Sequence, residues 1–212
     1  MADEQALAAV AADVAACARC ELHRGARLAV PGSGSPRAEI MLIGEAPSQY
    51  DDRSGTPFSG PSGAFLDELL ALVGLRRDDV FLTNIVKHRV PGGRELAPGE
   101  VQACAPYLTR QIAALDPLVV VTLGRGALHH FIPSGKISQL HGQARVARGR
   151  MVVAMYNPAA ALHQEALRQT VLDDFRRAIP AALAEARRLQ AAGALGQAVA
   201  PDADAPQQQS LF

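Results

Sequence analysis

Four short apolar runs alternate with helical segments along the chain, and this alternation limits the possible folds more than any other feature. The runs cover residues 38–43, 79–86, 118–123 and 151–155. Apolar residues at helical spacing predict helices over residues 6–18, 65–73, 98–115 and 162–190. Apolar strands separated by helices are typical of a parallel sheet that is covered on both faces. We therefore expect an α/β fold: a three-layer α/β/α domain with a central, mainly parallel four-stranded sheet.

The ends of these strands are the places where functional residues are expected. In open parallel sheets, ligands bind at the carboxyl ends of the strands. Those ends fall at Gly44, Asn84, Gly124 and Asn157. One domain over residues 1–190 accounts for all of these segments. Residues 191–212 are rich in Ala, Gln, Pro and Asp without periodicity, which predicts a flexible tail.

The net charge does not by itself point to a nucleic acid or to an anionic membrane, since 21 Lys and Arg residues balance 21 Asp and Glu residues. The charges are unevenly distributed, however. Residues 80–94 and 117–164 contain no acidic residue, and Lys87, Arg89 and Arg94 lie in the first of these stretches. This pattern has two readings: a locally basic face, or core strands and glycine loops that simply lack charge.

The N-terminus and the cysteines indicate the compartment. The sequence starts with the acidic segment MADEQAL, and it has no run of about 18 uncharged apolar residues. We therefore expect a soluble, cytoplasmic monomer with no membrane partner. Three cysteines, an odd number, are not typical of a disulfide framework in that compartment. Cys17, Cys20 and Cys104 are therefore predicted to be metal ligands or core thiols.

The loop after the first strand carries the most specific motif. It reads GEAPSQYDD from Gly44 and GTPFSGPSG from Gly55, and it lacks the GK[ST] of a phosphate-binding loop. The segments TN at Asn84, LG at Gly124 and YNPAAAL from Tyr156 follow at the ends of the later strands. In order and spacing, these motifs resemble those of the family 4 iron–sulfur uracil-DNA glycosylases, over residues 17–177.

The resemblance implies that Gly44, Ala46, Phe58 and Asn84 bind the substrate. Phe58 would stack on a uracil that has been flipped out of the DNA. The Asn84 amide, with one donor and one acceptor, would meet O4 and N3–H of uracil. Cytosine presents the opposite pattern at these two atoms, so a fixed amide rejects it.

Cleavage of the N-glycosidic bond needs a carboxylate near the sugar and a donor near uracil O2. Glu45 is the first candidate for the carboxylate, and Asp51 and Asp52 are the alternatives. Asn157 stands where the family has a histidine that donates to O2. Its NH2 group can donate a hydrogen bond but cannot carry a charge, so we expect weaker stabilisation of the uracil anion. His163, six residues later, is a possible substitute.

Two further features concern DNA. Pro158, Ala159 and Leu162 resemble the segment that wedges into the duplex beside the flipped base. His163 adjoins this segment and is included in the predicted DNA contact. Relatives that trap DNA covalently carry an inserted KRRIH loop, and residues 90–103 contain no such insertion.

The resemblance also implies a metal site. The family holds a 4Fe-4S cluster with two cysteines in C-x-x-C and two more that are 16 positions apart. Here Cys17 and Cys20 form the first pair, and His88 stands 16 positions before Cys104. Imidazole can ligate iron in such clusters. A zinc site with the same three cysteines and one histidine is the alternative.

The last residues resemble a peptide by which bacterial DNA enzymes bind the sliding clamp. Gln208, Leu211 and Phe212 match its anchoring positions, and Gln209 departs from the usual leucine. The whole pattern predicts a monofunctional base-excision glycosylase that acts on uracil-containing DNA, with the sliding clamp as a further partner. The alternatives are a glycosylase for another deaminated base and a non-catalytic module that binds uracil-DNA or the clamp.

Overall fold

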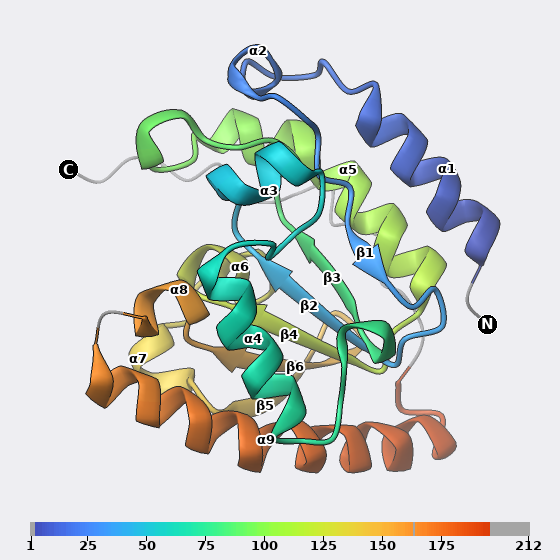
Figure 1. The fold of residues 1–212 in the computed structure, drawn as a ribbon. Helices are drawn as coiled ribbons and strands as arrows, with labels where there is room; N and C mark the ends of the chain where they lie inside the picture. Colours follow the sequence, from blue (N-terminus) through green and yellow to red (C-terminus); the bar gives the residue numbers. More distant parts are fainter. Residues whose placement is uncertain (1–2, 163, 196–212) are drawn as a thin grey trace.

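A six-stranded sheet lies between two layers of helices in the computed structural model, which describes residues 3–162 and 164–195 (Figure 1). The strands are β1 (Ser33–Gly34), β2 (Ile40–Gly44), β3 (Phe81–Asn84), β4 (Val119–Leu123), β5 (Gln143–Ala147) and β6 (Arg150–Met155). Their spatial order is β1-β3-β2-β4-β6-β5. The three-layer α/β/α fold is therefore confirmed, whereas the expected number of four strands is wrong.

The four predicted strands form the parallel centre of the sheet, and the two additional strands lie at its edges. Strands β3, β2, β4 and β6 pair in parallel, with Gly44 opposite Asn84. Strands β1 and β5 pair antiparallel to β3 and β6. Strand β1 has only two residues, and four of the five residues of β5 are exposed, so neither strand has the apolar pattern that predicts a strand.

The main helices cover both faces of the sheet. Helices α4 (Pro61–Ala71) and α9 (Glu165–Ala191) lie on one face, and α1 (Glu4–Ala15), α5 (Pro98–Leu115) and α6 (Arg125–Phe131) lie on the other (Figure 1). The short helices are α2 (Leu22–Gly25), α3 (Gln49–Ser54), α7 (Ile137–Leu140) and α8 (Pro158–Ala161), with 3-10 turns at Arg77–Asp79 and Pro91–Gly93.

Alternating side chains of the strands build two separate apolar cores. Leu42 points to the face where it joins Phe65 of α4 and Phe175 of α9. Its neighbour Met41 points to the opposite face, where it joins Leu108 of α5. Because successive side chains of a strand point to opposite faces, both halves of each central strand must be apolar, as the sequence indicates.

The predicted helices differ from the observed ones mainly at their ends. Helix α5 has the predicted bounds, whereas α9 begins at Glu165, three residues later than predicted. Helix α3 lies within the segment read as a loop. Its start is marked by a capping box, in which the Ser48 hydroxyl accepts from the Asp51 N–H and the Asp51 carboxylate accepts from the Ser48 N–H.

Among the described residues, no helix is both long and apolar enough to cross a membrane. Helix α9 ends at Ala191, and the division of the chain near residue 190 stays a prediction. The predicted clamp-binding residues Gln208, Leu211 and Phe212 lie outside the described residues, as does His163.

Candidate active site

A cleft of about 540 Å³ opens where the central strands end. Its walls come from the segments that follow β2, β3 and β6, together with α3, the start of α4 and α8. Seven predicted site residues line it: Gly44, Glu45, Ala46, Asp51, Phe58, Asn84 and Asn157. The cleft also includes Ala159, from the segment predicted to contact DNA. The structure thus brings together residues that are 113 positions apart in the sequence.

Gly44, Phe58 and Asn84 form one tightly packed group. A Cβ atom on Gly44 would collide with Asn84 Oδ1 and would lie 2.8 Å from Phe58 Cζ, so only glycine leaves room for both side chains. The Asn84 side chain is buried, and its Nδ2 has no hydrogen-bond partner. A buried donor left unpaired costs about 1–3 kcal/mol. This NH2 group is therefore available to an acceptor that enters the cleft.

Phe58 is held at the cleft by its backbone. Its φ of 54° lies in the left-handed region, which bulky residues rarely adopt. Arg77 stabilises this conformation, since Nη2 donates to the Phe58 carbonyl oxygen over 2.6 Å and Nε pairs with Asp67. A Cβ atom on Gly63 would collide with the same carbonyl oxygen. The glycine and the arginine together fix the direction in which the ring points.

Glu45 lines the cleft with a carboxylate that has no hydrogen-bond or ion-pair partner among the described residues. None of the hydrogen bonds and ion pairs among the described residues involves its carboxylate, which lies against Gly126 of α6. Asp51 also lines the cleft, but its oxygens accept from the Ser48 N–H and from the Ser59 N–H and hydroxyl at 2.8–2.9 Å. This difference favours Glu45 over Asp51 for chemistry.

Asp52, the other predicted alternative, does not line the cleft. Its carboxylate is buried, where Oδ1 accepts from the Arg27 N–H over 2.8 Å and Oδ2 pairs with Arg89 over 3.4 Å. Arg89 lines the cleft, and its Nε is buried without a hydrogen bond. Asp52 thus joins the N-terminal segment to the segment after β3 and has the contacts of a structural residue.

Asn157 lies at the start of a short helix beside the cleft. It is the N-cap of α8, where its Oδ1 accepts from the Ala159 N–H over 2.9 Å. The NH2 group is then the end of the side chain that remains for a ligand. Pro158 is buried, and Leu162 is half-buried against the core. Of the predicted wedge residues that the structure describes, Ala159 is the one that lines the cleft.

The three cysteines, of which Cys104 is far from the other two in the sequence, lie near one another in the fold. Burial raises the pKa of the Cys104 thiol, and nearby Cys17 and Cys20 raise it further, while the Lys87 N–H opposes them with a hydrogen bond of 3.3 Å to Sγ. Among the described residues, no group of three or more His, Cys, Asp or Glu side chains is arranged to hold a metal ion. The Cys17 and Cys20 thiols are nevertheless close enough to raise the pKa of Cys104.

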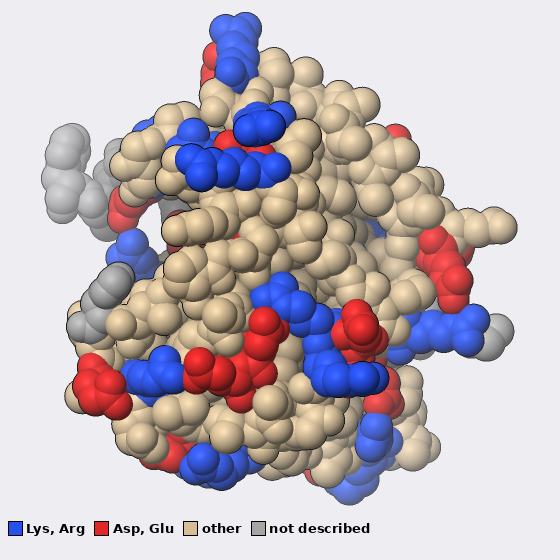
Figure 2. Space-filling view, viewed as in Figure 1, with Lys and Arg blue, Asp and Glu red and all other residues tan. Residues whose placement is uncertain are grey.

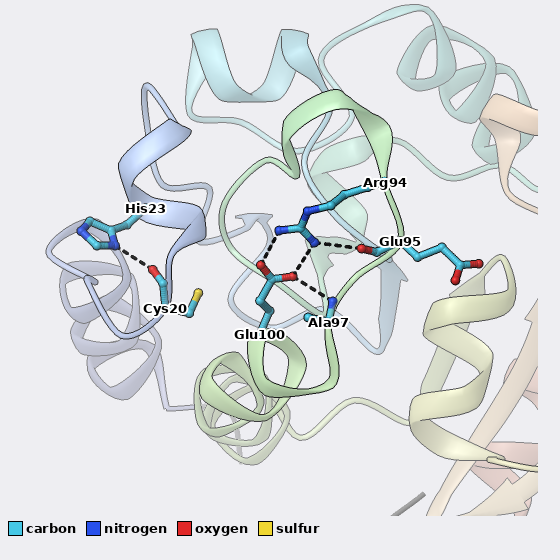
Figure 3. Close-up of polar contacts among 6 residues, drawn as sticks. All are labelled: Cys20, His23, Arg94, Glu95, Ala97 and Glu100. Atoms are coloured by element: carbon cyan, nitrogen blue, oxygen red, sulfur yellow. Dashed lines mark hydrogen bonds and ion pairs between the residues drawn. The ribbon is translucent and has the colours of Figure 1, made fainter. Parts of the chain in front are cut away.

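His88, the fourth predicted metal ligand, is buried next to the segment that ends β3. The ring is buried, and its Nδ1 has no hydrogen bond. Burial lowers the pKa of His88, nearby His23 lowers it further and Asp52 opposes this, so the neutral ring that can ligate a metal is favoured. The ring of His23 is itself held by Cys20, whose carbonyl oxygen lies 2.7 Å from Nδ1 (Figure 3).

Most basic residues of the acid-free stretch after β3 are neutralised or buried. Lys87 is fully buried, and Arg94 forms two hydrogen bonds of 2.6 and 2.9 Å with Glu100, at the start of α5 (Figure 3). For residues 80–94, the structure therefore favours a core strand and glycine loop that lack acidic residues over a locally basic face. On the face shown in Figure 2, positive and negative side chains lie side by side and do not form a uniformly basic patch.

Comparisons with known proteins assign the chain to a family. The family model described as the uracil DNA glycosylase superfamily matches residues 31–179. The chain belongs to the uracil-DNA glycosylase superfamily. Over 174 residues it is 39% identical to the type-4 uracil-DNA glycosylase of Archaeoglobus fulgidus, which covers 78% of this chain and 87% of that protein. The predicted resemblance to family 4 is therefore confirmed.

Two further relatives carry the same name. The type-4 uracil-DNA glycosylase of Sulfurisphaera tokodaii is 38% identical over 175 residues, which cover 78% of this chain and 80% of that protein. That of Thermotoga maritima is 34% identical over 180 residues, which cover 82% of this chain and 94% of that protein. The matched region of this superfamily member contains the whole cleft.

Sequence reasoning missed several residues of this glycosylase site. Arg89, Arg94 and Ser62 also line the cleft. Arg77 contacts the backbone of Phe58, and Gly126 packs against the Glu45 side chain. The polar residues in the motif loop could have suggested Ser62. The roles of Arg77 and Gly126 depend on contacts between distant segments, which no local pattern indicates.

Proposed function

We propose that this glycosylase removes uracil from DNA by reading the flipped base with Asn84 and by hydrolysing the N-glycosidic bond beside Glu45, leaving an abasic site. The observation that carries the proposal is the buried, unpaired Nδ2 of Asn84 at the cleft. This donor meets O4 of uracil, and Oδ1 accepts from N3–H. Phe58 provides the ring on which the base stacks.

Glu45 and Asn157 supply the two electrostatic effects that bond cleavage needs. Positive charge develops on the sugar, where the free carboxylate of Glu45 stabilises it or orients the attacking water. Negative charge develops on uracil O2, where the Asn157 NH2 donates a hydrogen bond. The amide is neutral, so this second effect is weaker than that of the histidine found in the family motif.

The enzyme is monofunctional in this proposal. Strand cleavage by a glycosylase would need an amine that can attack the sugar, and the chain has two lysines. The Lys87 ammonium is buried and donates three hydrogen bonds, and Lys136 does not line the cleft. The product is therefore an abasic site in an intact strand.

The residues at the cysteine site fit a 4Fe-4S cluster. Cys17, Cys20, Cys104 and His88 would hold it, because three thiols and one buried imidazole nitrogen without a partner form a suitable donor set. A bound cluster would act structurally, joining the N-terminal segment to the segment after β3. Zinc held by the same residues is the alternative, and metal analysis separates the two.

The proposed activity is tested by incubating the protein with oligonucleotides that carry uracil, hypoxanthine or xanthine. Alkali is then added to cleave the strand at any abasic site. We expect cleavage at uracil and a loss of about 100-fold in the single-turnover rate for Asn84→Ala, because the base loses two hydrogen bonds. Gln139→Ala, which truncates an exposed amide, is the control and should retain the rate. Cleavage at another base, or binding without cleavage, would contradict the proposal.

The cluster is tested on the purified protein by iron, sulfide and zinc analysis together with visible absorption. We expect iron and sulfide in equal amounts and an absorption band that His88→Ala and Cys104→Ala remove or weaken. His129→Ala, which truncates an exposed histidine, is the control. Stoichiometric zinc without iron would overturn the cluster in favour of the zinc site.

A further inference from the structure

Lys87 is a fully buried lysine whose side chain makes a complete set of hydrogen bonds. It lies three residues after the end of β3, directly before His88, and has no exposed surface. Its Nζ donates to Thr83 Oγ1, to the Asn84 carbonyl oxygen and to Gln111 Oε1, each over 2.7 Å. An ammonium group has three protons, so every one of them has an acceptor.

This arrangement is costly, which indicates that it serves a purpose other than filling the core. Apolar residues of similar volume stabilise a core at least as well as a buried charged group does. A methionine would fill the same space without the cost of desolvating a charge.

The three acceptors connect the base-reading residue to the helix that carries Cys104. Asn84 ends β3, and Gln111 lies in α5 together with Cys104. Gln111 Nε2 also donates to the Pro31 carbonyl oxygen over 2.5 Å, and Thr83 Oγ1 donates to the same oxygen over 3.0 Å. The network therefore holds the backbone of Asn84 against two other parts of the molecule.

The side chain of Asn84 makes no hydrogen bond within the described part of the chain, so packing holds it there. It lies against Gly44 and Phe58, and its Nδ2 has no partner before a base enters. The direction of the amide is therefore set by its packing and by the position of its own backbone. Lys87 holds that backbone at the carbonyl group of Asn84 itself.

We propose that Lys87 is a positioning residue that holds Asn84 in the orientation required to read uracil. This inference rests on the proposed function, in which Asn84 contacts the base. Lys87 does not line the cleft and acts through Asn84. A misplacement of about 1 Å in a binding group can reduce a rate about 100-fold, so a small shift of the strand end is sufficient.

The decisive experiment is a double-mutant cycle with Lys87→Met and Asn84→Ala, read out as the single-turnover rate on a uracil oligonucleotide and as inhibition by free uracil. We expect Lys87→Met to reduce both the rate and the affinity for uracil on the order of 10- to 100-fold. In the Asn84→Ala background, the same substitution should have little further effect. Lys136→Met, at an exposed lysine, is the control and should match the unmodified protein.

The outcomes separate the inference from the proposed function. A substitution at Lys87 that lowers the rate equally in both backgrounds, or that leaves the rate and the uracil affinity unchanged, overturns the inference. If Asn84→Ala itself retains uracil affinity, the proposed function fails instead. Should Lys87→Met not fold, Thr83→Val removes one of the three acceptors at nearly constant volume and should give a smaller loss with the same dependence on Asn84.

Discussion

Asn157 is the residue at which this glycosylase departs most clearly from the family motif. In the structure it caps α8 through Oδ1, which leaves its NH2 group for the cleft. A protonated histidine at this position would donate from a charged ring, but both of its nitrogens would then be donors and neither could accept from the Ala159 N–H. Asparagine therefore keeps the helix cap and gives up the charge of the donor.

Replacing Asn157 with His should raise the single-turnover rate of uracil release about 10-fold, because hydrogen bonds from charged donors are about twice as strong as neutral ones. Asn157→Ala, the matched control, should lower the rate, since the donor is lost. Both are measured on the same uracil oligonucleotide under single-turnover conditions. A lower rate for the histidine variant would refute the argument from charge.

The family motif was sufficient to predict the residues of the motif loop and of the strand ends that line the cleft, but it could not predict the other lining residues or how the charged ones are paired. Glu45 and Asp51 are both acidic residues in one loop. Only the structure shows that the Asp51 carboxylate accepts hydrogen bonds from Ser48 and Ser59. Lys87 lies in an acid-free stretch that was a candidate basic face. Its burial depends on Gln111, which is 24 positions away, and no local pattern reveals that contact.

Helix α6 approaches the cleft closely through its second residue, Gly126. A Cβ atom there would collide with Oε2 of Glu45 and would lie 2.7 Å from its Cγ. The first turn of the helix therefore forms the wall against which the candidate catalytic carboxylate rests. Any larger residue at this position must move that carboxylate.

Gly126→Ala should accordingly lower kcat about 10- to 100-fold with little change in KM for DNA, because the displaced carboxylate no longer faces the sugar. Gly99→Ala is the control, since a Cβ atom in the first turn of α5 would have open space. Steady-state kinetics and a thermal unfolding curve distinguish the two variants. An unchanged kcat for Gly126→Ala would show that the position of Glu45 is not critical.

Element prediction failed where the hydrophobic pattern was weak. The central strands are apolar on both sides and were found, but β5 pairs only at an edge, and its residues face water. Helix α3 has six residues, too few for a periodic pattern, although the S-x-x-D of its capping box was present in the sequence. Short elements are fixed by their caps and neighbours, so capping motifs deserve weight where periodicity is absent.

At the scale of the whole molecule, the balanced charge of the chain agrees with the face shown in Figure 2, where positive and negative side chains lie side by side. Basic residues near the cleft are held in ion pairs, such as Arg94 with Glu100 and Arg125 with Glu95. Contact with the enzyme's DNA therefore depends on a few positions around the cleft more than on a general positive field. A sliding clamp would help such an enzyme to reach its substrate by raising the local concentration.

Removal of Leu211 and Phe212 should abolish retention of the enzyme by an immobilised bacterial sliding clamp, while activity on short oligonucleotides stays unchanged. The expected loss follows from the removal of the two apolar anchors of the predicted clamp-binding peptide. Removal of Asp202 and Ala203, within the same tail, is the control and should preserve binding. Equal retention of the shortened and full-length chains would reject the clamp as a partner of this segment.

The unpaired buried atoms have a consequence for the folding free energy of the enzyme. Within the described residues, the buried side-chain atoms that lack a hydrogen bond are Asn84 Nδ2, His88 Nδ1 and Arg89 Nε, all in one stretch of six residues. Arg89 Nε still lies 3.4 Å from Asp52 Oδ2 in an ion pair, whereas the unpaired Asn84 Nδ2 and His88 Nδ1 make the unliganded fold less stable. The free energy of unfolding is therefore lowered by groups within residues 84–89. A bound base and a bound metal would each raise it again by binding to this same short segment.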